Sequence, residues 1–333
     1  MAIDGTTTNN CENDGVTASD TIGVLAEKLR ASVSKGKLVT ESHLSIIERD
    51  VLVDGAKAKV HLFSPQLDGN NRISPDRLVE YLFSRIVDYA IPKKKIDAAF
   101  ANYEATGSSS EILKLEREAR KLFTNLKNSG EGGELLLFAL AEGVFKLTHL
   151  LCKMSLKTNK KMHYNGADGV YATIGDGNWL DIWWGESKLY QNPTTAITDC
   201  LKSLAPFLRD EHSSDSAAAR DIYLINDQAN IEHPEALAIL KSFLDPDDAN
   251  SKKMRMCGFA MVGFDSSVLP ANGQSAVWQE IEEALKNSLP NWSKHIGKRL
   301  GIEKIIDFEM HFIMVPFRSV AAFRKALLDE LGL

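Results

Sequence analysis

The chain of 333 residues is long enough for one large domain or two ordinary ones. Its composition, 44% hydrophobic and 25% charged, is that of an ordinary soluble globular protein. The net charge of −6 argues against a surface coated in positive charge for non-specific DNA binding, although local basic patches would suffice for nucleic acid.

Residues 1–18 predict a disordered leader, because the start is polar and acidic and lacks the basic and apolar parts of a signal peptide. No uninterrupted apolar run is long enough to span a bilayer. The four cysteines are far apart and form no CxxC pair, which argues against a zinc site or a disulfide framework. We therefore expect a cytoplasmic protein without membrane contact.

Residues 19–105 predict an N-terminal α/β extension. The apolar spacing and the capping residues indicate a helix, a strand-rich segment and two further helices, at residues 20–34, 37–65, 75–89 and 92–106. A charged helix capped by Ser108–Ser110 then runs to about Asn128.

The segment SGEGGELLLFALAEGVFKLTHLLCKM predicts an apolar helix from about Gly133 to Met154 that packs against a sheet. Glu134 lies in its first turn. A glutamate there favours the positive end of the helix dipole.

A basic connector follows this helix. Its lysines are either solvated loop charges or phosphate contacts for a nucleic acid: Lys153, Lys157, Lys160 and Lys161. His163 has no second histidine at ligand spacing, so we interpret it as an ordinary loop residue.

Residues 166–191, GADGVYATIGDGNWLDIWWGESKLYQ, predict a β-hairpin. GVYATI and WLDIWW are rich in β-branched and aromatic residues, and GDGN between them collects residues that accept positive φ. A turn at Asp176–Gly177 would bring Asp168 beside Gly185–Glu186 in the antiparallel register.

Three polar side chains of this hairpin would then converge. Glu186 and Lys188 are two residues apart and so share one face of a strand, and Asp168 returns beside them. Two hard oxygen donors suit Mg²⁺ or Mn²⁺, and a lysine can orient water and offset charge on a phosphate. The alternative is a surface salt bridge, but charges directly after a bulky apolar run favour a functional site.

The remaining chain alternates between helices and strands. The expected helices are residues 193–208, 233–243, 275–289 and 320–331, and the expected strands are DIYLIND (221–227), 254–265 and 305–317. DEHSSDSAAARD before the first of these strands reads as a linker. The pattern predicts an α/β fold with a mixed sheet and helices on both faces.

Asp followed by Glu-x-Lys on a hairpin resembles the active site of the PD-(D/E)xK nuclease superfamily, although Ala167 rather than proline precedes Asp168. More specifically, the order FANYEATG, EILKLEREARKLF, SGEGGELLLFAL, YNGADGVYA and GESKLY is similar to the nuclease subunit of the Hachiman antiphage defence system of bacteria. This resemblance covers about residues 76–210.

The resemblance implies a restriction-endonuclease-like nuclease domain over residues 106–333 and a metal-dependent DNA nuclease that works with a superfamily 2 helicase. It further implies that Glu134 joins Asp168 and Glu186 as a ligand of Mg²⁺ or Mn²⁺, while Lys188 steers water. Glu131 and Glu142 are rival candidates for the ligand on this helix, but GGELLLF matches the family pattern best. Gln191, just past the lysine, is a candidate DNA contact. The alternative is a non-cutting DNA- or partner-binding regulatory subunit of a helicase complex, against which the three intact hairpin residues argue.

Overall fold

The computed structural model describes residues 18–33, 39–73, 75–123, 130–156, 166–209 and 216–332. The expected leader therefore lies almost entirely outside the described residues. Within them, no helix is both long and apolar enough to cross a membrane.

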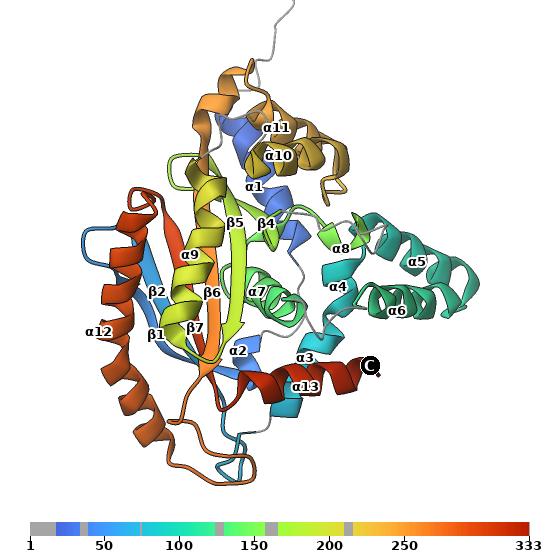
Figure 1. Ribbon diagram of the computed structural model, residues 1–333. Coiled ribbons are helices and arrows are strands. Elements are labelled where there is room, and N and C mark those ends of the chain that lie inside the picture. Colours follow the sequence, from blue (N-terminus) through green and yellow to red (C-terminus); the bar gives the residue numbers. More distant parts are fainter. Residues whose placement is uncertain are drawn as a thin grey trace, which may run out of the picture.

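A mixed seven-stranded sheet forms the centre of the protein, in the order β1-β2-β7-β6-β5-β4-β3 (Figure 1). The strands are β1 (Leu44–Leu52), β2 (Ala58–Pro65), β3 (Thr148–His149), β4 (Gly169–Gly175), β5 (Trp179–Tyr190), β6 (Met254–Asp265) and β7 (Met310–Phe317). The central pairs β2–β7, β7–β6 and β6–β5 are parallel, whereas the outer pairs β1–β2, β5–β4 and β4–β3 are antiparallel. The expected mixed sheet is thereby confirmed.

The helices precede, interrupt and follow these strands along the chain. They are α1 (Ala18–Ser32), α2 (Val39–Ser42), α3 (Pro75–Ser84), α4 (Ile86–Ala90), α5 (Lys93–Thr106), α6 (Ser110–Leu122), α7 (Glu131–Gly143), α8 (Lys153–Leu156), α9 (Pro193–Arg209), α10 (Ala217–Gln228), α11 (Pro234–Leu244), α12 (Trp278–Ile302) and α13 (Val320–Leu331), with a 3₁₀ turn at Ala249–Lys253.

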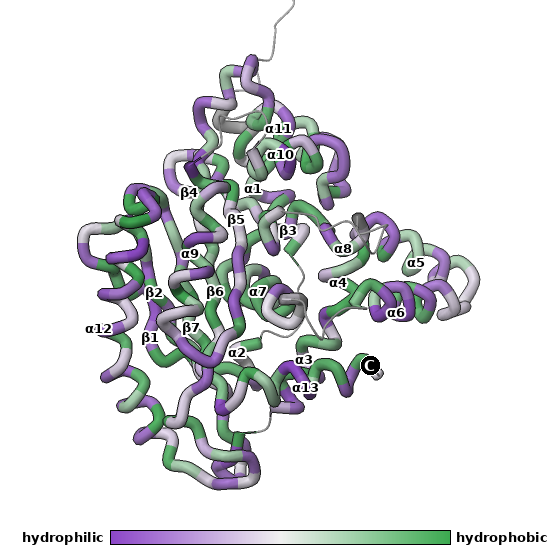
Figure 2. Tube along the Cα trace, viewed as in Figure 1, coloured by the Kyte–Doolittle hydropathy of each residue, from purple (hydrophilic) through white to green (hydrophobic). Residues whose placement is uncertain are grey.

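Helices cover both faces of the sheet, as expected. One core lies between the sheet and the helices α1, α9, α10, α11 and α12, and the other between the sheet and α3, α4, α6, α7 and α13. Consecutive residues of β5 alternate between the two cores, so that Trp184 enters the first and Trp183 the second. Figure 2 shows hydrophobic residues gathered in β6 and α7. This architecture is compatible with a restriction-endonuclease-like core.

The N-terminal strands belong to the same sheet as the predicted hairpin. β2 pairs with β7 from Ala58 opposite Met310 to Leu62 opposite Met314. Strands from both sides of the proposed boundary at residue 105 thus share one hydrogen-bonded layer.

The expected strand DIYLIND is wrong, because these residues lie within α10. Ser216 caps this helix by accepting a hydrogen bond from the Ala219 amide, and three alanines, strong helix formers, follow the cap. The buried residues of α10 are Ala218, Asp221 and Ile225, which have helical spacing. The short alternation of polar and apolar residues in DIYLIND suggests a strand instead.

The apolar helix expected from Gly133 to Met154 is much shorter than predicted. It ends at Gly143, and Lys146 then adopts a left-handed conformation with φ of 57°. The rest of the apolar run forms β3, a connector and α8, so that its hydrophobicity reflects burial rather than one continuous helix.

In contrast, the helix expected over residues 275–289 begins at Trp278 and continues through Pro290 to Ile302. Its buried side chains continue past the proline: Ile281, Leu285, Leu289, Ile296 and Leu300. Packing of this apolar stripe outweighs the backbone hydrogen bond that the proline lacks. The basic stretch SKHIGKRLG therefore lies within a helix.

Gly133 permits the close contact between α7 and β5. A Cβ atom at this position would lie 2.9 Å from Ser187 Oγ and 3.3 Å from Leu189 Cγ. We expect Gly133→Ala to lower the free energy of unfolding by about 1–3 kcal/mol, through overpacking. Chemical denaturation would measure the change.

Gly301 provides the matched control, because a Cβ atom there would meet nothing within 4 Å. Gly301→Ala should raise the free energy of unfolding by up to about 1 kcal/mol, since alanine favours the helix. Equal effects of the two substitutions would show that the approach of α7 to β5 does not depend on Gly133.

Candidate active site

The predicted hairpin is confirmed, although its turn takes in the three residues 176–178, so that Gly175 pairs with Trp179. Gly169 lies opposite Gly185, and the Asp168 amide donates a hydrogen bond to the Gly185 carbonyl oxygen at 2.9 Å. The chain reverses through a tight turn in which Gly177 and Asn178 have φ values of 72° and 62°. Asp168 therefore enters the sheet beside Glu186, as the sequence predicts.

β5 extends beyond its antiparallel partner. It pairs with β6 as far as Tyr190, whereas β4 begins only at Gly169. Asp168 lies along the side of β5 that β4 leaves unpaired. Its Oδ2 accepts hydrogen bonds from the amide and the hydroxyl of Ser187, each at 2.8 Å. These two bonds fix the carboxylate at the end of the hairpin.

Glu186 and Lys188 form a close pair on one face of β5. Lys188 Nζ donates to Glu186 Oε1 at 2.5 Å, and the side chains are 7% and 22% exposed for Glu186 and Lys188. Burial, followed by the negative charge of Asp168, raises the pKa of Glu186 to about 8 despite the opposing effect of Lys188. A buried carboxyl group with a raised pKa has too little positive charge around it to ionise readily, and an additional cation would supply that charge.

The pKa of Lys188 is raised. Burial acts to lower it, but the charges of Glu186 and Asp168 together outweigh burial. The ammonium group therefore remains charged at neutral pH, which favours positioning and charge stabilisation over proton abstraction.

Glu134 approaches this group from the first turn of α7. Its Oε2 accepts a hydrogen bond from the Tyr89 hydroxyl at 2.8 Å, and its charge contributes to the raised pKa of Glu186. The rival Glu142 is buried in an ion pair with Arg85 at 3.0 Å, and thus already has a cationic partner. Tyr89 is itself buried, and burial together with Glu134 raises its pKa.

The candidate DNA contacts differ in what the structure describes of them. Lys157, Lys160, Lys161 and the neighbouring His163 lie outside the described residues. Gln191 is exposed immediately beyond β5.

The suggested phosphate contact through Lys153 is wrong. Its side chain is only 10% exposed, and Nζ donates to Asp221 Oδ2 at 2.6 Å. The ammonium group is therefore engaged inside the protein. The basic character of the surrounding sequence conceals this, because the partner carboxylate is 68 residues away along the chain.

Sequence reasoning missed two side chains that hold the acidic residues in place, Ser187 and Tyr89. Ser187 stands between Glu186 and Lys188 in the motif, so its position offered a signal. Tyr89 carries no local signal, since only the packing of α4 against α7 brings its hydroxyl to Glu134.

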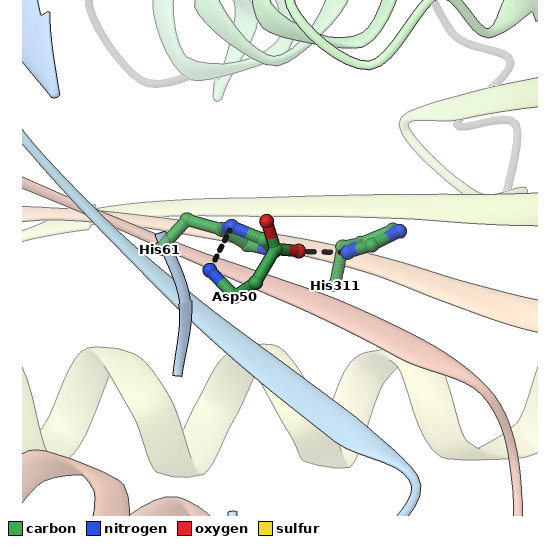
Figure 3. A group of neighbouring side chains, drawn as sticks. All are labelled: Asp50, His61 and His311. Atoms are coloured by element: carbon green, nitrogen blue, oxygen red, sulfur yellow. Dashed lines mark hydrogen bonds between the residues drawn. The ribbon is translucent and has the colours of Figure 1, made fainter. Parts of the chain in front are cut away.

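Potential metal-ligand atoms of Asp50, His61 and His311 lie within 4.8 Å of one another on the other side of the sheet's centre (Figure 3). Among the described residues, Asp168, Glu186 and Glu134 form no group of this kind. The Asp50 amide donates to His61 Nδ1 at 3.2 Å, so the proton of neutral His61 is on Nε2. That proton is donated to His311 Nδ1 at 2.9 Å. A cation on His61 Nε2 would move the proton to Nδ1, against the Asp50 amide, and the arrangement therefore favours a hydrogen-bonded chain over a metal centre.

The family model described as HamA matches residues 41–331, which is most of the chain and includes every residue of the acidic group. This match confirms the resemblance to a component of the Hachiman system. No curated protein matches the chain.

The raised pKa of Glu186 predicts a pH-dependent stability in metal-free solution. Between the ordinary value of 4.5 and about 8, the folded chain retains a proton on Glu186 that the unfolded chain releases. This contribution to the free energy of unfolding is complete below about 4.5 and is lost as the pH rises towards about 8. Glu186→Gln, which cannot ionise, should lack it.

Urea denaturation of both chains across this pH window would measure the difference. The variant should gain stability relative to the parent as the pH rises. Two parallel stability curves would mean that Glu186 ionises normally in the folded protein.

Proposed function

The chain belongs to the HamA family and is thus a component of a Hachiman antiphage defence system, and on this premise we propose that it is a metal-dependent deoxyribonuclease that hydrolyses phosphodiester bonds. The observation that carries the proposal is the convergence of Asp168, Glu186 and Lys188 at the end of β5, with Glu134 beside them. Phosphodiester hydrolysis needs carboxylates that can hold a metal ion and a positive group that can stabilise negative charge, and these residues supply both.

The carboxylates are the proposed ligands of a divalent cation. Asp168, Glu186 and Glu134 offer hard oxygen donors, which Mg²⁺ and Mn²⁺ prefer. The raised pKa of Glu186 supports this assignment, because the side chain is buried beside other acids with too little positive charge to ionise it fully. When bound, the cation would supply Lewis acidity that polarises the scissile phosphate and acidifies a water molecule.

The protein's own residues would organise the reacting groups. Ser187 holds the carboxylate of Asp168 through two hydrogen bonds, and Tyr89 holds that of Glu134 through one. Lys188 would orient the attacking water and offset the negative charge that develops on the phosphate. Because Lys188 stays protonated, it does not serve as the general base.

The proposed substrate is DNA, presented by a superfamily 2 helicase of the same defence system. The net charge of −6 supports weak DNA affinity of the chain alone, and a helicase partner would supply delivery and restraint. Gln191 and the lysines at 157, 160 and 161 are the candidate contacts to the polynucleotide. Invading DNA would cause the helicase to release the nuclease, and the chain would then be a conditional effector.

We expect the purified chain to cut supercoiled or linear DNA with Mg²⁺ or Mn²⁺ and to stop when a chelator is added. Glu186→Gln and Lys188→Met should each lower the cleavage rate by about 100-fold or more, because the first removes a charged metal ligand and the second removes the group that offsets the developing negative charge. Gel-based cleavage rates would measure these changes, first with the chain alone and then with the helicase and ATP.

Glu111 and Lys114, an exposed ion pair on α6, provide the matched control. Glu111→Ala/Lys114→Ala removes the same two residue types and should leave the rate unchanged. Cleavage that survives loss of Glu186 and Lys188 would refute the assigned site. No cleavage even with helicase and ATP would favour the alternative, a non-cutting regulatory subunit.

A further inference from the structure

A buried ion pair lies directly behind the acidic group. Lys153 of α8 and Asp221 of α10 meet at 2.6 Å, with side chains that are 10% and 1% exposed. The Asp168 and Glu134 charges also act on Lys153, which places this ammonium group within electrostatic reach of the proposed metal ligands. The pair is thus adjacent to the site without belonging to its solvent-facing part.

The ion pair is hydrogen-bonded to the backbone of Ala167, the residue before Asp168. Lys153 Nζ donates a second hydrogen bond, to the Ala167 carbonyl oxygen at 2.6 Å, and the Ala167 amide points to Asp221 Oδ2 at 3.4 Å. On its other side, the Asp168 amide is bound to Gly185 of β5. The residue before the proposed ligand is therefore held by α8 and α10 at the same time.

Stability alone gives a poor account of this arrangement. Desolvation of two charges offsets much of the attraction within a buried ion pair, so apolar side chains of similar volume are often as stable. In addition, Asp221 Oδ1 is buried and has no hydrogen-bond partner among the residues that the structure describes. An unmatched acceptor of this kind weakens the folded state further.

We propose that Lys153 and Asp221 are positioning residues, which set the direction in which the backbone presents Asp168 to the cation. This inference rests on the proposed function, because it assigns the pair a role in the same site. Groups that orient ligands in this way typically contribute 10- to 100-fold to metal affinity.

The test replaces the pair by apolar residues of similar size, Lys153→Met/Asp221→Leu. The double variant should unfold slightly below the temperature of the parent, because both charges leave together but the Ala167 carbonyl oxygen and amide lose their partners. Its affinity for Mn²⁺ should fall by about 10- to 100-fold, because Ala167 is no longer held. Calorimetric titration with Mn²⁺ alone and thermal unfolding measure the two effects separately.

A second largely buried pair, Arg299 with Glu303 at the end of α12, provides the matched control, and Arg299 Nε also lacks a hydrogen-bond partner among the described residues. This pair lies at the end of an element that contributes no residue to the acidic group, so Arg299→Met/Glu303→Leu should leave the Mn²⁺ affinity within about twofold of the parent. An equal loss of affinity in both double variants would reduce the effect to general loosening of the fold and overturn the proposal.

Asp168→Asn separates failure of this inference from failure of the proposed function. If Asp168→Asn weakens Mn²⁺ binding and the apolar double variant does not, the positioning role is refuted while the metal site stands. If Asp168→Asn has no effect, the metal site itself is refuted. If the apolar double variant fails to fold, two single variants replace it. Lys153→Arg keeps the charge and should retain the Mn²⁺ affinity, whereas the isosteric Asp221→Asn should lower that affinity by about tenfold. Parental Mn²⁺ affinity in Asp221→Asn would then refute the positioning role.

Discussion

The acidic group depends on one constraint, the unequal lengths of neighbouring strands. β5 keeps its parallel partner β6 to Tyr190, while β4 joins only from Gly169. The last residues of β5 are thus paired with a strand along one side and have no strand partner along the other. Asp168 occupies the open side. Gly133 lets the first turn of α7 approach Ser187 and Leu189 on one face of the sheet, close enough to contribute Glu134.

The part of the site that is local in sequence could be predicted from sequence. Alternating residues and the GDGN turn determine the hairpin register, and this register is sufficient to bring Asp168 to Glu186. The supporting residues are different, because Tyr89 and Asp221 reach the site from elements far away along the chain. Nothing in their neighbouring residues distinguishes them from other buried side chains.

The errors in the predicted elements have the same origin. DIYLIND has the short alternation of a strand, yet the capped alanine run before it starts a helix whose buried face includes Asp221. Pro290 suggests a helix end, yet the apolar stripe of α12 continues on both sides of it. In both segments, tertiary packing decides among conformations that local sequence allows, and in α10 it also determines a contact to Ala167.

The order of the strands along the chain has a consequence for biosynthesis. A ribosome that has made residues up to Tyr190 has already synthesised Glu134, Asp168, Glu186 and Lys188. The parallel neighbour of β5 ends only at Asp265, and that neighbour in turn pairs with β7, which ends at Phe317. A nascent chain therefore possesses the acidic residues long before it possesses the sheet that gathers them, so assembly of the site is deferred until β7 has been translated.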